Sequence, residues 1–331
     1  MNPKGLRALV ATLAVGILAL AGCSGTPASS PSASGSAPAK AVKIGITQIV
    51  THPALDAARE GFKKALADAG IQATYDEQNA QGDAATATSI ANKFKDAGLD
   101  LILAIATPTA QATAQVVTTT PILFTAVTDP VAAKLVTSAE APGANVTGTS
   151  DLNPVAEQIA LVKKIKPDAK SVGVIYSSGE VNSEVQVKLA KEAAAKEGLT
   201  LVEKTVSTAG EVSQAAQSLD VDAIYVPTDN NVVSAIASVV QVAEQKKIPI
   251  VAGDGDTVKA GAVITYGLDY NKLGYQTGQM AVKILNGSAK PATMPVETQK
   301  DLQLLINSKA AARMGVTIPA DLAAKATDVG K

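Results

Sequence analysis

The most informative feature of this 331-residue chain is what it lacks. It has one cysteine, Cys23, one histidine, His52, and no tryptophan. A single cysteine excludes an internal disulfide and a cysteine-based zinc site. A single histidine argues against a multi-histidine metal centre and against a histidine-dependent catalytic triad. The sequence therefore predicts no metal site and no cofactor.

Recognisable catalytic motifs are also missing. The chain has no Gly-x-Ser-x-Gly elbow, no Walker loop, no His-Glu-x-x-His and no Gly-x-Gly-x-x-Gly. We expect no catalytic residue and no enzymatic activity. An enzyme remains the first rival interpretation, which robust turnover of a substrate would support.

Aromatic residues and excess charge of one sign are scarce. Aromatics make up 3% of the chain, so the core must consist of alanine, valine, isoleucine and leucine, which suits parallel sheets covered by helices. Lysine and arginine number 29 against 30 aspartate and glutamate. This balance argues against nucleic acid as a partner, because phosphate binding requires a basic surface.

The first 23 residues have the order of a bacterial export signal. Lys4 and Arg7 precede an apolar stretch, residues 8–20, that is too short to span a bilayer comfortably. The stretch ends in Leu20-Ala21-Gly22-Cys23, which resembles a lipobox, so we expect Cys23 to be lipidated and to become the new N-terminus. The alternatives are a plain signal peptide and an N-terminal membrane helix.

Residues 24–40 consist almost entirely of serine, glycine, alanine and proline. Such a segment cannot bury apolar area and predicts a disordered tether. A lipid followed by a tether places the body of the protein on the extracytoplasmic side of the cell membrane.

From residue 42 onward, strand-like and helix-like segments alternate, which predicts parallel sheets with helices on both faces. The predicted strands cover residues 42–47, 72–76, 101–106, 122–127, 171–176, 201–205, 223–226, 248–252 and 263–268. The predicted helices cover residues 53–69, 84–97, 108–117, 155–166, 183–197, 211–219, 231–246 and 272–285.

The series of elements restarts after a Gly- and Ser/Thr-rich crossover, residues 145–152. The fold class is therefore α/β, with two Rossmann-like lobes joined by a hinge of several strands. We expect residues 41–150 plus about 269–296 in one lobe, and residues 151–268 plus about 297–331 in the other.

A ligand site is expected between the lobes, because ligands bind outside the carboxyl ends of parallel strands. Free N–H groups at helix starts attract an anion such as a carboxylate. The candidates for this are Thr107, Thr109, Asn182 and Ser183. The carboxylates that could pair with an ammonium are Asp129, Asp229 and Asp254. Gln48 and Asn230 could serve either charge. Together these groups suit an α-amino acid.

Each candidate also has a structural interpretation. Ser, Thr, Asp and Asn at helix starts are commonly just caps. His52 is as well explained by an exposed capping-region position as by ligand contact. Tyrosines near strand ends could line an apolar sub-pocket, although such side chains are more often half-buried packing. They are Tyr176, Tyr225, Tyr266 and Tyr270.

Several motifs in order resemble the ABC-transporter substrate-binding proteins assigned to tryptophan/tyrosine-type uptake, from about residue 42 to about residue 315. They are Gln48-Ile-Val-Thr-His-Pro-Ala-Leu-Asp56, Asn79-Ala-Gln-Gly-Asp83, Ala104-Ile-Ala-Thr-Pro-Thr-Ala-Gln111, Phe124-Thr-Ala-Val-Thr-Asp-Pro130, Asn145-Val-Thr-Gly148 and Val226-Pro-Thr-Asp-Asn230.

The resemblance implies a type I periplasmic-binding-protein fold that closes on its ligand. It also implies an aromatic amino acid as ligand, and permease and ATPase subunits as partners. The Thr107–Thr109 turn, Asp129, Asn182–Ser183, Asp229–Asn230 and Asp254 match pocket-forming segments of such proteins. The alternatives left open are a sugar or nucleoside-like ligand, and a ligand-sensing lobe that serves a membrane receptor. A monomer is expected.

Overall fold

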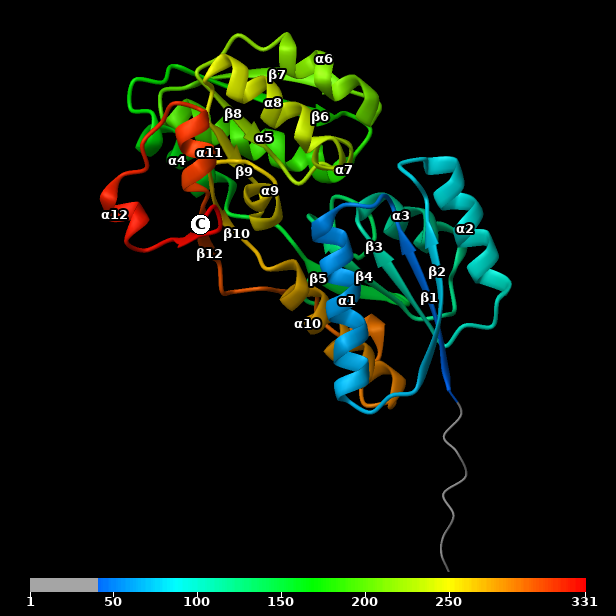
Figure 1. Cartoon of the computed structure of the whole chain (residues 1–331). Coiled ribbons are helices and arrows are strands. Elements are labelled where there is room, and N and C mark those ends of the chain that lie inside the picture. Colours follow the sequence, from blue (N-terminus) through cyan, green and yellow to red (C-terminus); the bar gives the residue numbers. More distant parts are fainter. Residues whose placement is uncertain (1–40) are drawn as a thin grey trace, which may run out of the picture. The chain divides into compact units, whose positions relative to one another are not determined.

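Two β-sheets carry the body of the chain in the computed structural model, which describes residues 41–331 (Figure 1). The predicted export signal, Cys23 and the tether lie outside the described residues. None of the helices within residues 41–331 combines the length and the apolar character needed to cross a membrane.

The first sheet has the order β11-β5-β4-β3-β1-β2, and all its strands pair in parallel. Its strands are β1 (Val42–Gln48), β2 (Ala73–Asn79), β3 (Leu101–Ile105), β4 (Ile122–Val127), β5 (Val146–Ser150) and β11 (Glu297–Thr298). The helices that accompany it are α1 (Pro53–Asp68), α2 (Ala84–Asp96), α3 (Thr107–Val116) and α10 (Tyr270–Leu285). We call this sheet with its helices the first lobe.

The second sheet has the order β13-β12-β10-β9-β8-β6-β7, and only β12 runs antiparallel to its neighbour β10. Its strands are β6 (Ser171–Ser177), β7 (Thr200–Val206), β8 (Ala223–Val226), β9 (Ile250–Ala252), β10 (Ile264–Gly267), β12 (Gln303–Ile306) and β13 (Thr327–Asp328). The accompanying helices are α4 (Val155–Ile165), α5 (Val181–Lys196), α6 (Val212–Gln217), α7 (Asn230–Ser234), α8 (Ile236–Lys246), α9 (Gly255–Lys259), α11 (Ser308–Arg313) and α12 (Ala320–Ala323). We call this set the second lobe.

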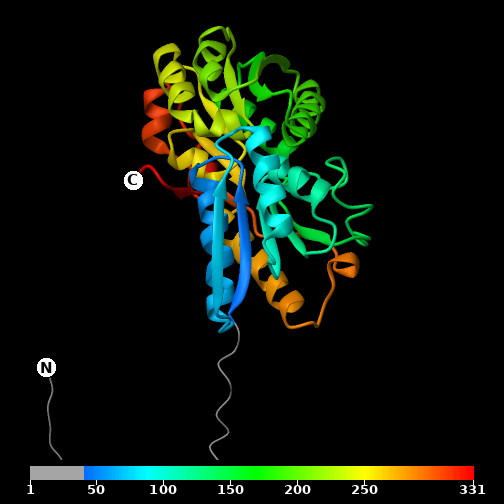
Figure 2. The same cartoon turned by 90° about the vertical axis from the view of Figure 1, so that its right-hand side faces the viewer.

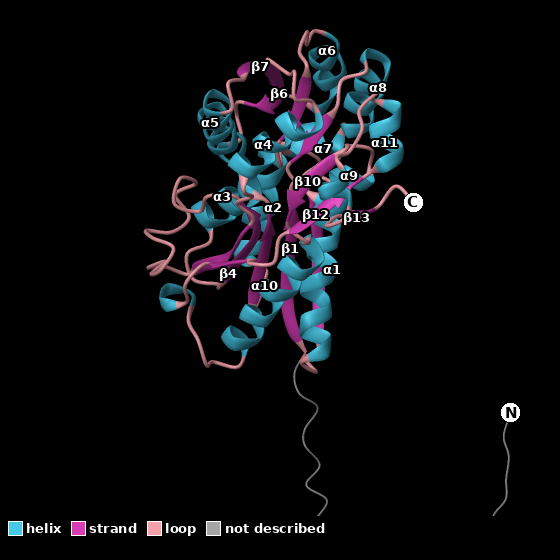
Figure 3. Cartoon of the chain, turned by 90° about the vertical axis from the view of Figure 1, so that its left-hand side faces the viewer, coloured by secondary structure: helices cyan, strands magenta, loops and turns pink. Residues whose placement is uncertain are grey.

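The predicted α/β class with two sheets is confirmed. Figures 2 and 3, seen from opposite sides, show helices beside the strands of both sheets. Each sheet has its own apolar core, the first built around Phe62, Phe94 and Phe124, the second around Tyr225. Continuous apolar runs such as β3 and β4 are buried along their whole length, as expected for parallel strands covered on both faces.

Three local predictions differ from the structure. The helix predicted over residues 231–246 is two helices, because α7 ends at Ser234, whose Oγ bonds the Asn231 carbonyl and competes with the helical pattern. The short helices α9, α11 and α12 were not predicted. The helix predicted to begin at Ser183 begins at Val181, so Asn182 and Ser183 lie in its first turn.

The chain passes between the sheets three times, after β5, after β10 and after β11. Glu297 and Thr298 pair with β5 and so belong to the first sheet, whereas the sequence analysis assigned the chain from about residue 297 to the second lobe. The crossover segment itself is partly regular, because β5 occupies most of the predicted linker 145–152. The three crossings connect the lobes.

Candidate functional site

A small cavity lies at the carboxyl ends of the strands of both sheets. The space in it that the centre of a water molecule can reach is about 10 Å³, which is room for about one water. The cavity is lined by His52, Ala54, Leu55, Ala126, Asp151, Asn182, Thr228, Asn230, Val233, Asp254 and Tyr270. Both lobes contribute, and Asp151 and Tyr270 lie beside the first two crossings.

The ionisable groups of the cavity wall are mainly acidic. Asp151 and Asp254 are buried, no lysine or arginine lines the cavity, and no ion pair within residues 41–331 involves either carboxylate. Burial raises the pKa of Asp151, and it raises the pKa of Asp254 to about 6. Two buried carboxylates without a cation are stabilised by a ligand that brings one.

Hydrogen bonds hold both carboxylates in place. Asp151 accepts from the Tyr270 hydroxyl at 2.6 Å and from the Thr128 hydroxyl at 3.1 Å. Asp254 is the N-cap of α9, and it accepts from the Thr257 N–H at 2.8 Å and the Thr257 hydroxyl at 2.7 Å. Each carboxylate is thereby oriented, with lone pairs left for a ligand.

The N-terminal end of α1 also faces the cavity, and the N-terminus of a helix carries a partial positive charge. Its N-cap residue, His52, makes no side-chain capping bond, and Pro53 has no N–H to offer. Ala54 and Leu55 follow in the first turn and line the cavity. The Asp or Asn N-caps of α2, α7, α9, α10 and α11, by contrast, accept a backbone N–H. Asp56 in the same turn is held by Gln48 and Arg59. The uncapped N–H groups of the first turn of α1 therefore offer a carboxylate a place in the cavity wall.

Unpartnered polar atoms gather at the same site. Within the described residues, the buried side-chain atoms without a hydrogen bond are Thr47 Oγ1, His52 Nδ1, Thr107 Oγ1, Asn153 Oδ1, Asn182 Oδ1 and Thr228 Oγ1. Three of these residues, His52, Asn182 and Thr228, line the cavity. Buried polar groups rarely remain unpaired, so these atoms indicate a polar ligand.

Two further buried acids stand behind the cavity wall. Asp229 accepts from the Ser177 N–H at 2.6 Å, the Ser183 hydroxyl at 2.7 Å and the Val232 N–H at 2.9 Å. Glu180 accepts from the side-chain amides of Asn182 and Asn230. Burial raises the pKa of both acids, and burial together with the neighbouring Asp229 raises the pKa of Glu180 to about 7.

The imidazole of His52 is uncharged at neutral pH. Burial lowers its pKa to about 4, although a hydrogen bond to the Asn230 side chain raises it in part. A residue of the first lobe thus meets a residue of the second lobe at the cavity.

The predicted site residues fall into three groups. Asn182, Asn230 and Asp254 line the cavity. Ser183 and Asp229 stand directly behind it and bond each other. The remaining residues are outside the lining: Gln48, Thr107, Thr109 and Asp129.

Two of these outer residues make local backbone contacts. The Thr109 hydroxyl donates to the Ile105 carbonyl at 2.7 Å, and Asp129 accepts from the N–H groups of Val131 and Ala132. Both contacts are the turn and cap roles considered as alternatives.

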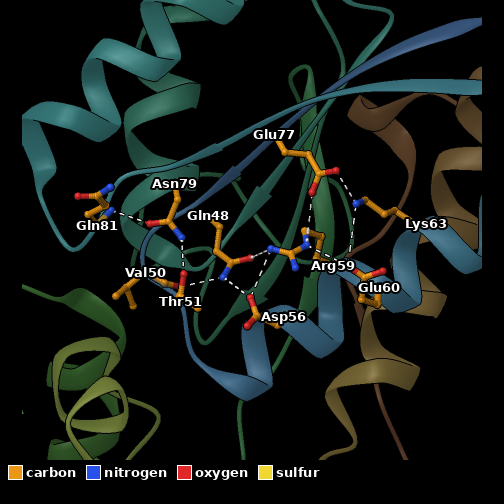
Figure 4. A network of polar contacts seen from close by, with 10 residues as sticks. All are labelled: Gln48, Val50, Thr51, Asp56, Arg59, Glu60, Lys63, Glu77, Asn79 and Gln81. Carbon is orange, nitrogen blue, oxygen red and sulfur yellow. Dashed lines mark hydrogen bonds and ion pairs between the residues drawn. The ribbon is translucent and has the colours of Figure 1, made fainter.

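Gln48 belongs to a polar network at the N-terminal end of α1 (Figure 4). Its amide donates to Asp56 Oδ1 at 2.9 Å and to the Val50 carbonyl at 2.8 Å, and Arg59 donates to its oxygen. Asn79 donates to Thr51 in the same loop. The network fixes residues 49–52, and so positions His52 and the start of α1.

Sequence reasoning missed Asp151 and left His52 and Tyr270 undecided. Asp151 directly follows β5, so the rule applied to other strand ends also selects it, but that segment was interpreted as a linker. Ala126 was missed because it reaches the cavity through a β-bulge, where its φ is 56°. Tyr176, Tyr225 and Tyr266 are not in the lining, and the Tyr225 hydroxyl donates to Gln158 inside the core.

Comparison with known proteins identifies the family to which the chain is similar. The model described as "ABC transporter substrate binding protein" matches residues 43–330. A tyrosine-binding protein of Clostridioides difficile (strain R20291) is 44% identical over 315 residues, which cover 93% of this chain and 91% of that protein.

Two solved structures are also similar. A Streptococcus pneumonia ABC domain in complex with L-Trp has a TM-score of 0.84 and 37% identity, and the match covers 87% of this chain and 99% of that one. A ligand-free, open structure of a substrate-binding protein with adhesive properties from Clostridium difficile has a TM-score of 0.64 and 48% identity, over 85% of this chain and 97% of that one. The described chain thus superposes better on the complex than on the open structure.

Proposed function

This chain belongs to the ABC transporter substrate-binding protein family and has its type I periplasmic-binding-protein fold, and from that membership we propose that it captures an aromatic amino acid, tyrosine or tryptophan, in the cavity between its lobes. The names of its relatives, one binding tyrosine and one solved with L-Trp, support this ligand class.

The observation that carries the proposal is the arrangement of opposite charges at the cavity. Asp151 and Asp254 suit the ligand's ammonium group, and the first turn of α1 suits its carboxylate. Ala54, Leu55, Ala126 and Val233 offer apolar contact for the side chain. A zwitterion with an apolar side chain satisfies all three.

Capture requires motion of the lobes, because the cavity as it stands has room for about one water. The open form admits the ligand, which contacts both lobes only after closure and so shifts the population toward the closed form. The closed form delivers the amino acid to a permease with its ATPase. Lipidation of Cys23 holds the protein on the extracytoplasmic side of the membrane.

The test is calorimetric titration with L-tyrosine, L-tryptophan and two analogues of tyrosine. Tyramine lacks the carboxylate, and 3-(4-hydroxyphenyl)lactate has a hydroxyl in place of the ammonium. We expect both analogues to bind at least tenfold more weakly than tyrosine, since a hydrogen bond to a charged group contributes about 1.5–3 kcal/mol. Binding of a sugar or nucleoside instead of any amino acid would overturn the proposed ligand while leaving the family intact.

The matched variants are Asp151→Asn and Asp254→Asn, with Asp256→Asn as the control. Asp256 lies in the same helix as the Asp254 cap and pairs with Lys259, but it does not line the cavity. We expect each of the first two to weaken tyrosine binding at least tenfold and the control to leave it unchanged. Equal affinity in all three would show that the ammonium site lies elsewhere.

A further inference from the structure

In the conformation described, the cavity between the lobes is too small for an amino acid. The centre of a water molecule can reach about 10 Å³ of it, which is room for one particle of the size of water. The chemistry of the cavity wall therefore decides which small particle this closed conformation can hold.

Two buried carboxylates in the cavity wall have no cation to compensate them. Asp151 is 3% exposed and Asp254 is 1% exposed, no lysine or arginine lines the cavity, and none of the ion pairs of the described chain involves either acid. Each carboxylate oxygen accepts a hydrogen bond from a neutral donor and keeps a second lone pair. A cation placed between the two acids offsets the cost of burying their charges.

Two neutral oxygens of the wall are also without a partner. The amide nitrogen of Asn182 donates to Glu180 Oε2 at 2.9 Å and to the Thr228 carbonyl at 3.2 Å, so the amide oxygen, Oδ1, points away from both acceptors. Asn182 Oδ1 and Thr228 Oγ1 are buried and make no hydrogen bond. Both residues line the cavity, so each oxygen is available to a particle inside it.

The kind of cation follows from its size and its coordination. Calcium takes about six to eight oxygen ligands and magnesium keeps several of its waters, and a cavity with room for one particle provides for neither. Residues 41–331 also contain no group of three or more histidine, cysteine, aspartate or glutamate side chains placed to hold a metal ion. An ammonium ion is similar in size to water, and each of its N–H groups can donate to one of these oxygens as a charge-assisted hydrogen bond.

We propose that this cavity binds the free ammonium ion, which is held by Asp151, Asp254, Asn182 Oδ1 and Thr228 Oγ1. The ion contacts the same two carboxylates that are proposed to receive the ammonium group of the amino acid, and it does so in a conformation that excludes the rest of that ligand. Free ammonium is therefore a second ligand that opposes capture of the first. Only this competition rests on the proposed function, because the ion site itself needs no amino acid.

The first test is thermal unfolding of the protein without amino acid, in equal concentrations of ammonium, potassium and tetramethylammonium chloride. It is made at pH 8, above the pKa of Asp254, which is about 6. Potassium is similar in size but donates no hydrogen bond, and tetramethylammonium has no N–H and is too large for the cavity. We expect a higher melting temperature in ammonium than in the other two salts, because a ligand that binds the folded state stabilises it. Equal melting temperatures in ammonium and potassium would overturn the proposal.

The matched variants are Asp151→Asn and Thr228→Val, with Asp256→Asn as the control. Asparagine removes the charge of Asp151, and valine keeps the shape of Thr228 but removes its oxygen. Asp256 pairs with Lys259 at 2.8 Å and does not line the cavity. We expect the difference in melting temperature between ammonium and potassium to vanish in Asp151→Asn, to shrink in Thr228→Val and to persist in the control. An undiminished difference in either of the first two variants would overturn the assigned set of oxygens.

The second test is competition, measured by calorimetric titration with L-tyrosine in the same salts. We expect the apparent dissociation constant to double at an ammonium concentration equal to the ion's own dissociation constant, and to be unchanged by tetramethylammonium. Tyrosine binding that is indifferent to ammonium would overturn the competition. If the protein bound neither tyrosine nor tryptophan while ammonium still raised the melting temperature, the proposed function would fail and the ion site would stand.

Discussion

At the scale of single residues, the protonation of the buried acids in the cavity is linked to the binding of the ligand's ammonium group. Asp254 is protonated below about pH 6 because burial disfavours its charge. Its native pKa lies above the ordinary value, so its proton is held in the folded state and lost as the pH rises through 6. An ammonium ligand favours the ionised form and so displaces that proton.

The affinity for L-tyrosine should therefore rise between pH 5 and pH 7. Binding releases a proton where Asp254 is still protonated in the free protein and releases little where it is already ionised. Titration calorimetry in buffers of different ionisation enthalpy measures the protons released directly. We expect release at pH 5.5 that declines toward pH 8 in the wild type and is smaller in Asp254→Asn. A pH-independent affinity would exclude Asp254 as the ammonium partner.

Ala126 shows that the cavity wall contains backbone strain. Its φ of 56° lies in the left-handed region, which costs an alanine about 1 kcal/mol more than a glycine. Glycine adds chain entropy to the unfolded state at either position, at a cost of about 0.5–1 kcal/mol. In Ala126→Gly the relief of strain should offset this cost, so we expect its free energy of unfolding, measured by denaturant titration, to stay near that of the wild type. Ala104→Gly, in the buried strand β3, should lower the free energy of unfolding by about 1 kcal/mol, because no strain is relieved there and a buried methyl is lost. Equal destabilisation by both variants would show that the bulge is not strained.

At the scale of elements, the contact between α1 and α10 holds two parts of the cavity wall together. Both helices present their N-terminal ends to it, through His52 and Tyr270, and they lie side by side in Figure 1. Glycines allow the close approach: a Cβ on Gly274 would lie 1.8 Å from the Ala58 carbonyl oxygen, and one on Gly61 would lie 2.0 Å from that of Asn271.

Gly274→Ala should destabilise the protein by about 1–3 kcal/mol and also weaken tyrosine binding. The added methyl would clash with the backbone of Ala58, which cannot rotate away as a side chain can. The helices must therefore separate, and His52 and Tyr270 move with them. Thermal unfolding and calorimetry give the two effects. Gly210→Ala is the control, since only Thr208 Oγ1, at 3.8 Å, lies near its added methyl. Normal affinity in a destabilised Gly274→Ala protein would separate the helix contact from the site.

Most of these elements could be predicted because their signal is local. The buried strands β1, β3 and β4 are short apolar runs, and α1 carries a helical apolar face that ends before Gly70. The helix α9 could not be predicted, because five residues are too few for periodicity and their helical conformation depends on the Asp254 cap. The turn before it was instead interpreted as a source of free carboxylates.

At the scale of the whole molecule, the cavity exists only where both lobes and two of the crossings meet. The topological rule placed the ligand at the strand ends, and this was sufficient to select Asn182, Asn230 and Asp254. It could not separate them from Thr109 and Asp129, because only the packing of the lobes decides which strand-end side chain faces the cavity. Asp151 and Tyr270 could not be identified from the sequence for the same reason, since they reach the site from the segments that cross between the lobes.

Ligand binding should compact the molecule and stabilise it. In small-angle X-ray scattering, we expect the radius of gyration to fall when L-tyrosine is added. At a ligand concentration about a hundred times the dissociation constant, the fold should gain about 2.7 kcal/mol, visible as a rise in melting temperature. Asp151→Asn with Asp254→Asn should show neither change at the same concentration. Compaction without added stability would argue against capture between the lobes.

The three crossings also govern the order in which the chain can fold. The first lobe begins at β1 and is not complete until α10 has packed against α1 and β11 has paired with β5. Segments of the first lobe more than two hundred residues apart must meet, and the second lobe is not complete until β12 has paired with β10 and β13 with β12. The topology that builds the hinge therefore also delays folding until nearly the whole chain has been made.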